Sequence, residues 1–386
     1  MPGVSFGDNG GMTSASHSSA AAEPFEGLRI RGVAKTFGAD TTVLNEIDLD
    51  VHPGELISLV GSSGTGKSTL LRIIAGLEEP SAGRVTYAGQ SLKRGLVGVV
   101  FQRPILYPHL SVKDNILFPT RLGAFSGGVD MDYYRELLEA LKLEGLESRK
   151  PSQLSGGQAQ RVGIARALIR RAPVVLFDEP LASVDEEMSA SIRADIVRLH
   201  ERYGFTGLYV THDQNEALML GQRVAVMDAG YLVQVDTPER LLAHPHTLQV
   251  AKLMAAPALN LVALEDSAVL PAGCQLAIRA TALCPVAADA AHSLPVQVLG
   301  SRHLVGGMLY RARLLEAVSL PLESRRASAD SEPSDRVYAR VRAGQELEFF
   351  IPDAQSGSSL NVGDRVHLGV AAERCFVFSN GKRFYL

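Results

Sequence analysis

A glycine-rich segment that follows a short apolar run places the strongest constraint on how this chain can fold. Residues Ile57 to Val60 read as a buried strand and lead directly into the segment. The segment consists of Gly61, Ser62, Ser63, Gly64, Thr65, Gly66, Lys67, Ser68 and Thr69. The helical pattern after it consists of Leu70, Leu71, Ile74 and Leu77. Glycines allow a tight turn that aims backbone N–H groups at one point, and the helix start adds its positive dipole end. The sequence therefore predicts a phosphate-binding loop in an α/β fold.

Two side chains of this loop carry the chemistry that a nucleotide needs. Lys67 is placed to reach the β- and γ-phosphates, and the Ser68 hydroxyl is placed to ligate Mg²⁺. The alternative is a glycine-rich loop that matches by chance. The strand pattern before it and the helical pattern after it favour the nucleotide site.

A second glycine-containing helix start lies further along the chain, at Ser155, Gly156, Gly157 and Gln158. A strand, Val174 to Phe177, then ends in Asp178-Glu179. In the order and spacing of these motifs, the chain resembles the ATP-binding subunits of ABC transporters. One subunit does not need two γ-phosphate sites, so the second helix start fits a partner's ATP. The resemblance implies two subunits packed head to tail, with each nucleotide held between one subunit's phosphate loop and the other's signature.

The resemblance also assigns roles around the phosphates. Asp178 is expected to make the second Mg²⁺ contact, and Glu179 to polarise the attacking water; the alternative for Glu179 is a helix-start carboxylate before Pro180. Gln102 matches the residue that senses Mg²⁺ and the water. His212, in Thr-His-Asp after an apolar strand, matches the histidine that contacts the γ-phosphate, whereas a lone histidine is more often a surface or core residue.

Two further matches concern the edges of the site. Phe37 falls where this family stacks an aromatic ring on adenine; the alternative is a core aromatic in an early strand. Asp185 falls in the loop between the two subunits. Val184 stands where the family more often has Leu, which affects fine interface packing only.

Composition limits the other function classes. The chain has 386 residues, 46% of them hydrophobic, and a formal net charge of −4. This length predicts two domains, and the charge gives no positive field for DNA or RNA, so no nucleic-acid partner is expected. No apolar stretch approaches the roughly 18 to 20 residues that cross a bilayer. The three cysteines, Cys274, Cys284 and Cys375, lack zinc-site spacing and fit a reducing compartment.

The distribution of residue types along the chain predicts three parts. Residues 1–27 are rich in Gly, Ser and Ala and are expected to form a disordered tail, and residues 28–258 alternate strand and helix patterns as an ABC ATPase domain requires. A helical subdomain is expected between Gln102 and the signature, with Gly123 to Gly128 at its edge. Residues 259–386 show short alternating segments, typical of a small all-β barrel, with a polar insertion at 323–336. This part resembles the transport-associated OB-type domain of importer ATPases, except that Ala280-Thr281 replace its usual Pro-Glu.

The predicted function is therefore the energy-coupling ATPase of an importer, with ATP and Mg²⁺ as cofactors. Its expected partners are a second ATPase subunit, two integral membrane permease subunits and an extracytoplasmic solute-binding protein, and its place is the cytoplasmic face of the inner membrane. A non-transport ABC ATPase is the rival, but this chain has one ATPase unit and no long coiled coil. A binding module without turnover is opposed by the intact Lys67, Asp178, Glu179 and His212.

Two stretches bear on partners and solute. Pro104 to Leu110 is expected to line the groove where a membrane-subunit helix docks, although Ile105, Leu106 and Tyr107 could instead be core residues. Val250 to Leu261 resembles the Pro-x-x-Asn segment that joins core to barrel in sugar and glycerol-phosphate importers, with Pro257 and Asn260 in those places. We therefore expect a sugar, polyol or glycerol 3-phosphate as the solute, with inorganic ions, iron or polyamines as the alternative.

Overall fold

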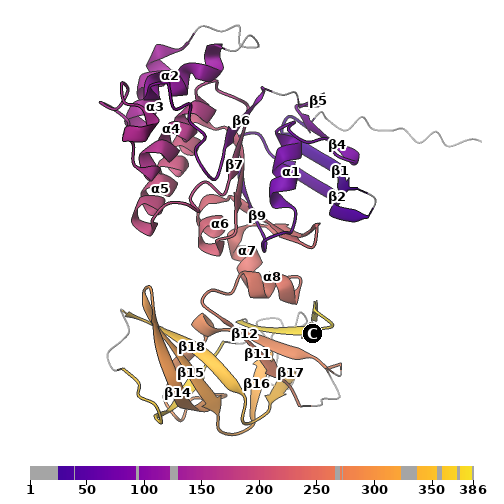
Figure 1. Cartoon of the computed structure of the whole chain (residues 1–386). Helices are drawn as coiled ribbons and strands as arrows, with labels where there is room; N and C mark the ends of the chain where they lie inside the picture. The colour runs from indigo at the N-terminus through magenta and orange to yellow at the C-terminus, as the bar shows by residue number, and fades with distance from the viewer. Residues whose placement is uncertain are drawn as a thin grey trace, which may run out of the picture.

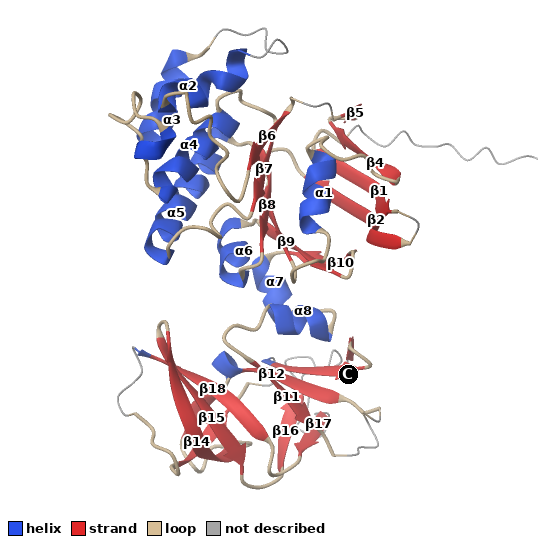
Figure 2. Cartoon of the chain, viewed as in Figure 1, coloured by secondary structure: helices blue, strands red, loops and turns tan. Residues whose placement is uncertain are grey.

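The computed structural model consists of two lobes that meet at a short helix, α8 (Leu248–Leu253) (Figure 1). It describes residues 25–38, 40–92, 95–121, 129–265, 270–271, 273–322, 337–353, 359–371 and 374–384. The predicted tail up to residue 24, the Gly123 to Gly128 stretch and the 323–336 insertion lie outside the described residues. The first lobe mixes helices and strands, and the second is built of strands (Figure 2).

A six-stranded sheet forms the centre of the first lobe, in the order β10-β9-β3-β8-β7-β6. The strands are β6 (Val97–Val100), β7 (Val174–Asp178), β8 (Thr206–Thr211), β3 (Leu56–Val60), β9 (Arg223–Asp228) and β10 (Tyr231–Asp236). All neighbours pair in parallel except β9 and β10, which form an antiparallel hairpin around Ala229-Gly230. Strands β3 and β8 are buried along their whole length, as parallel strands covered on both faces must be.

Each face of this sheet packs on a different set of elements. Val174 and Leu176 of β7 join a core with helix α1 (Lys67–Ile74), whereas Val175 and Phe177 point to the other face and join a core with the longer helices. On the α1 side lies an antiparallel sheet of β2 (Thr41–Val51), β1 (Leu28–Phe37), β4 (Ala82–Tyr87) and β5 (Gln90–Ser91). On the other side lie α2 (Val112–Leu117), α3 (Met131–Ala140), α4 (Gly156–Leu168) and α5 (Glu186–Tyr203), with short 3₁₀ turns at Phe118–Arg121 and Pro151–Gln153. The helical subdomain predicted between Gln102 and the signature corresponds to α2 and α3, which pack together with α4 and α5.

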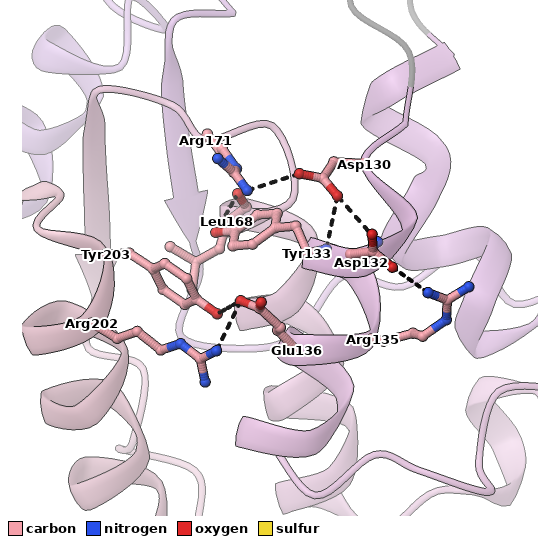
Figure 3. A network of polar contacts seen from close by, with 9 residues as sticks. All are labelled: Asp130, Asp132, Tyr133, Arg135, Glu136, Leu168, Arg171, Arg202 and Tyr203. Atoms are coloured by element: carbon pink, nitrogen blue, oxygen red, sulfur yellow. Dashed lines mark hydrogen bonds and ion pairs between the residues drawn. The ribbon is translucent and has the colours of Figure 1, made fainter.

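A polar network ties α3 to the ends of α4 and α5 (Figure 3). The Tyr133 hydroxyl donates to the Leu168 carbonyl at 3.2 Å, and the Arg171 guanidinium lies 4.4 Å from the centre of the Tyr133 ring. Arg171 Nη2 also donates to Asp130 Oδ2 at 2.9 Å, and Asp130 caps α3. The end of α4 is thereby held against the start of α3.

The same network continues to α5 (Figure 3). The Tyr203 hydroxyl donates to Glu136 Oε2 at 2.9 Å, and Arg202 Nη2 lies 3.1 Å from the same oxygen. Burial, together with the Glu136 carboxylate, raises the pKa of Tyr203 to about 12. The phenol therefore stays protonated at neutral pH and keeps donating its hydrogen bond.

The second lobe is all-β, as predicted. Its strands are β11 (Leu259–Ala263), β12 (Gln275–Arg279), β13 (Cys284–Val286), β14 (Leu294–Leu304), β15 (Gly307–Leu314), β16 (Val318–Leu322), β17 (Val337–Val341), β18 (Glu346–Pro352), β19 (Arg365–Gly369), β20 (Cys375–Ser379) and β21 (Lys382–Phe384). Among the described residues these strands pair as three sheets, ordered β11-β12-β20-β21, β13-β19-β14-β15-β18 and β16-β17, which share one apolar core. The OB type of this lobe, and the boundary at residue 259, stay predictions.

Helix α8 lies between the lobes and packs on both. Val250 and Met254 join the core formed with β9 and with α6 (Gln214–Leu220) and α7 (Pro238–Ala243). Ala251, the residue after Val250, packs against Phe376 and Phe378 of the β lobe. A change in the position of α8 would therefore be felt in both lobes.

The two adjacent tyrosines of α3 give a matched test of this packing. The Tyr133→Phe change removes the hydrogen bond to Leu168 and keeps the ring, so we expect the free energy of unfolding to fall by about 1 kcal/mol. The buried Tyr134 hydroxyl has no hydrogen-bond partner among the described residues, so Tyr134→Phe should be neutral or stabilising. Urea unfolding of the full chain measures both. Equal losses in the two variants would show that the Tyr133 hydrogen bond contributes nothing specific.

Candidate active site

The carboxyl ends of four neighbouring strands meet at one edge of the six-stranded sheet. Val60 of β3 lies beside Thr211 of β8, Val210 of β8 lies beside Asp178 of β7, and Phe177 of β7 lies beside Val100 of β6. The residues that follow these positions include Gly61, His212, Glu179 and Gln102. Ligands of open α/β sheets bind at this edge. The register therefore gathers the predicted catalytic residues, which lie far apart in the sequence.

Two positions of the glycine-rich loop, Gly61 and Gly66, have no room for a side chain. Gly66 has φ 97°, and a Cβ there would lie 2.7 Å from Leu44 Cδ2. A Cβ on Gly61 would lie 2.3 Å from the Met227 carbonyl oxygen. The loop runs from β3 to the start of α1 at Lys67, as predicted, with Ser62, Ser63 and Gly64 exposed. The loop is thus packed on its protein side and open on the other, which is the form of a cradle for phosphate.

Lys67 lies across this loop and is only 5% exposed. Its Nζ donates to the carbonyl oxygens of Gly61 at 2.8 Å and Ser62 at 2.9 Å. Burial lowers the pKa of Lys67, while the charges of Glu179 and Asp178 act in the opposite direction. The ammonium group is therefore held beside the exposed loop and between acidic groups, where it can meet phosphate oxygens.

Asp178 and Ser68 bring two oxygen ligands together. Ser68 Oγ donates to Asp178 Oδ1 at 3.2 Å, joining the start of α1 to the end of β7. Burial raises the pKa of Asp178, and the neighbouring Glu179 carboxylate adds to the rise, although the Ser68 hydrogen bond lowers it. A divalent cation would relieve both effects, and hydroxyl and carboxylate oxygens are the donors that Mg²⁺ prefers. These residues fit Mg²⁺ bound together with a nucleotide.

Glu179 sits in a constrained turn at the end of β7. Its φ is 45°, in the left-handed region, and its N–H donates to the Val210 carbonyl at 3.0 Å. Its Oε2 lies 3.1 Å from His212 Nδ1. A non-glycine residue with such a φ costs free energy, which other contacts must offset. The turn aims the Glu179 carboxylate at His212, so the structure brings these two predicted residues into contact.

Behind His212 lies a residue that the sequence analysis did not single out. Glu216 is buried, and its Oε2 accepts hydrogen bonds from Thr211 Oγ1 at 2.7 Å and from the Tyr209 hydroxyl at 3.2 Å. Thr211 Oγ1 in turn accepts from the Asp213 N–H at 3.0 Å, and Asp213 caps α6. Glu216 thus fixes the loop that carries His212. The spacing of Asp213 and Glu216, an N-cap and a carboxylate three residues later, is the sequence signal that could have found it.

Gln102 and Phe37 lie at the margin of the site. Gln102 is exposed. It follows Val100 of β6 by two residues, as Glu179 follows Phe177 of β7, and Val100 and Phe177 are paired. Phe37 is 44% exposed, so the alternative of a core aromatic is wrong. The Lys35 ammonium lies 4.9 Å from the centre of the Phe37 ring. Such a ring can stack on a flat ligand, but its adenine role stays a prediction.

The second helix start, at Ser155, forms as predicted, and it lies away from the phosphate loop. Ser155 caps α4 by accepting from the Gln158 N–H at 3.2 Å, and Gln158 Oε1 accepts from the Ser155 N–H at 3.0 Å. Ser155 and Gly156 are exposed, whereas a Cβ on Gly157 would lie 2.5 Å from Met188 of α5. Asp185 is also exposed and caps α5 through the Met188 N–H at 2.9 Å. These residues form a pre-shaped anion site that faces outward.

The phosphate loop and the signature belong to opposite sides of the sheet. Helix α1 packs on one face of β7 and helix α4 on the other (Figure 2). The chain therefore does not close its own signature over its own phosphate loop. Among the described residues, no helix is long and apolar enough to cross a membrane.

Comparisons with known proteins match this architecture. Residues 44–182 match the family described as ABC transporter. The chain is 44% identical over 241 residues to an sn-glycerol-3-phosphate import ATP-binding protein, UgpC 1, of Rhizobium johnstonii, covering 61% of this chain and 65% of that one. It is 42% identical over 266 residues to UgpC of Salmonella typhi, covering 66% of this chain and 74% of that one. Among solved structures, cbiO1 from Clostridium perfringens, part of the ABC transporter complex cbiONQ, aligns with a TM-score of 0.51 and 26% identity, over 57% of this chain and 92% of that chain.

Proposed function

Because this chain belongs to the ATP-binding proteins of ABC transporters, we propose that it is the ATPase subunit of an importer and hydrolyses ATP between two head-to-tail subunits. The observation that carries the proposal is the pairing of two half-sites. One is the cluster of buried Lys67, half-buried Asp178 and Glu179 and exposed His212, beside an exposed phosphate loop. The other is the exposed start of α4 at Ser155, on the opposite face of the sheet.

The chain's own residues divide the work of hydrolysis. The N–H groups of the loop and the Lys67 ammonium bind the phosphates, and the oxygens of Ser68 and Asp178 hold Mg²⁺, with Gln102 as a further ligand. Bound Mg²⁺ supplies positive charge to phosphate oxygens as the terminal phosphate leaves. Glu179 accepts a proton from the attacking water at its carboxylate, and His212, 3.1 Å away, orients that carboxylate and faces the γ-phosphate.

The partner subunit completes the site. Ser155, Gly156 and Gly157 of the partner would present the positive end of α4 to the γ-phosphate, and Asp185 would lie at the same interface. ATP then binds more tightly to the closed dimer than to the open one. This difference in affinity is the free energy that moves the attached permeases between outward- and inward-facing states.

A groove beside Gln102 suits a permease helix. It has a volume of about 330 Å³ and is lined by residues that include Ile105, Tyr107, Phe118 and Arg166. Ile105 is 67% exposed and Tyr107 39%, so these two are not core residues, whereas Leu106 packs on the helical core. We place one permease subunit in this groove of each of the two ATPase subunits. An extracytoplasmic solute-binding protein then docks on the permeases from the other side of the membrane. The chain then works as a peripheral subunit on the cytoplasmic face of the membrane.

The Glu179→Gln change tests the catalytic assignment. The amide keeps the shape of the side chain and loses the base, so ATP should still bind while hydrolysis falls by about a hundredfold or more. The variant should accumulate as an ATP-bound dimer in size-exclusion chromatography. The exposed Glu144→Gln change is the control and should hydrolyse at the wild-type rate. A Glu179→Gln variant that turns over normally would refute the role of Glu179.

Mixed dimers test the two half-sites. A Lys67→Ala subunit retains its signature, and a Ser155→Arg subunit retains its phosphate loop, so each heterodimer contains one intact composite site. With random pairing, roughly a quarter of all sites are intact in an equimolar mixture. ATP hydrolysis in the mixture should exceed that of either variant alone. If subunits that demonstrably associate show no recovery, the head-to-tail arrangement is wrong for this chain.

We further propose that the solute is a sugar, a polyol or glycerol 3-phosphate. The support is the identity of 42 to 44% to sn-glycerol-3-phosphate import proteins, together with Pro257 and Asn260 at the junction between the lobes. Asn260 is buried there, and its side chain bonds to Ile278 and Glu348 of the β lobe. The ATPase does not touch the solute, so this assignment rests on likeness between ATPase subunits.

The solute is tested on the assembled importer. In vesicles that contain this chain and its permeases, ATP hydrolysis should rise when the cognate binding protein is loaded with glycerol 3-phosphate or a sugar. Sulfate, ferric iron and spermidine serve as the controls and should give the unstimulated rate. Stimulation by one of these controls alone would overturn the solute class and leave the ATPase assignment intact.

A further inference from the structure

A well-formed pocket lies between the two lobes, away from the phosphate loop. Its volume is about 660 Å³, within the range of small-molecule sites. The α/β lobe contributes the starts and ends of α6, α7 and α8, and the β lobe contributes β12 and residues beside β20. These elements face one another across the joint in Figure 2. The proposed ATPase function does not use this pocket.

Three charged side chains line the pocket: the guanidinium groups of Arg279 and Arg374 and the carboxylate of Glu239. Arg279 and Arg374 line it, and neither forms an ion pair with a carboxylate of the described residues. Burial lowers the pKa of Arg279 to about 10, and the guanidinium groups of Arg383 and Arg374 add to this effect. An anion in the pocket would offset both, because its negative charge would face the guanidinium groups of Arg279 and Arg374.

Arg279 is held in place by both lobes. Its Nη1 donates to the Leu242 carbonyl at 2.7 Å and its Nε to the Met254 carbonyl at 3.3 Å, at the ends of α7 and α8. Its guanidinium lies 5.1 Å from the centre of the Phe376 ring. The remaining nitrogen, Nη2, is buried and has no acceptor among the described residues. A buried donor without an acceptor is unfavourable, so negative charge close to the Arg279 guanidinium would be stabilising.

The rest of the lining is largely apolar. Leu242, Met254, Ala282 and Phe376 contribute to it, and Met254 and Phe376 are themselves buried. We propose that this pocket binds a small organic anion, with a carboxylate or phosphate group toward Arg279 and Arg374 and an apolar body against Met254 and Phe376. Inorganic phosphate alone would leave the apolar walls uncovered, so the apolar body is part of the proposal.

The position of the pocket couples it to the hydrolysis site. Gln214 and Asn215, in the first turn of α6, line the pocket, and α6 begins two residues after His212. Gln214 Oε1 also accepts from the Ala256 N–H at 3.1 Å, across the joint with α8. A ligand that moves this joint therefore moves the loop that carries His212. The anion acts as a regulator, and its affinity changes with the nucleotide state.

Calorimetry on the full chain, with ADP present to occupy the phosphate loop, tests the site. The probes are benzoate and phenyl phosphate, with benzyl alcohol as the neutral analogue and inorganic phosphate as the anion without an apolar body. Both organic anions should bind about tenfold or more tightly than either control. Arg374→Glu should weaken their binding by about tenfold or more, since it reverses an exposed charge on the wall.

Two further variants separate the site from general effects. Arg365→Glu makes the same charge change on β19, away from the pocket, and should leave binding unchanged. Thr281→Trp keeps both arginines and fills the pocket, so it should abolish binding. Equal binding of benzyl alcohol and benzoate, or unchanged binding in Arg374→Glu, would overturn the site. Binding of the anions without any change in the rate of ATP hydrolysis would overturn the regulatory role.

Discussion

The parallel pairing of β3, β8, β7 and β6 is the constraint on which the rest of the structure depends. Parallel neighbours end at the same edge, so the register that places Val60 beside Thr211 and Asp178 beside Val210 also sets the height of every catalytic side chain. A slip of one residue would turn the buried faces of these strands over. Because β3 and β8 are buried on both faces, such a slip would move each side chain into the opposite core, where its size and shape do not match its neighbours. The core therefore protects the geometry of the site.

The site holds charged side chains where partial burial disfavours their charged forms when no ligand is bound. Asp178 and Glu179 are adjacent, and burial raises the pKa of Asp178 while it lowers that of Lys67. Each of these shifts disfavours the charged form. A nucleotide bound with Mg²⁺ brings both signs of charge and satisfies both groups at once. The charges of these residues thus support the proposed binding of ATP together with Mg²⁺.

Local sequence patterns predicted most of the elements and failed where distant residues meet. The start of α1 at Lys67, the caps at Ser155 and Thr237 and the β9–β10 hairpin follow from short-range rules of glycine and capping chemistry. The capping rules point to Glu216 as a residue of the first turn of α6, but its hydrogen bonds from Tyr209 and Thr211 depend on β8 lying beside α6, which local patterns do not show. Nor could they show how the strands of the β lobe divide among sheets, since alternation sets which face a residue takes and not which strand it pairs with.

The contact between the lobes, like the candidate active site, contains a charged side chain that is partly removed from water. Arg279 donates to the carbonyls that end α7 and α8, groups that helix geometry leaves without intrahelical partners. The positive charge thereby meets the negative dipole ends of two helices, which explains why an arginine can be buried there. These partial charges are smaller than a full carboxylate, and Arg374 and Arg383 stand nearby. The charge of Arg279 at this joint is therefore offset by partial charges only. This is why we propose that an anion bound there acts through the joint on the sheet edge of the proposed hydrolysis site.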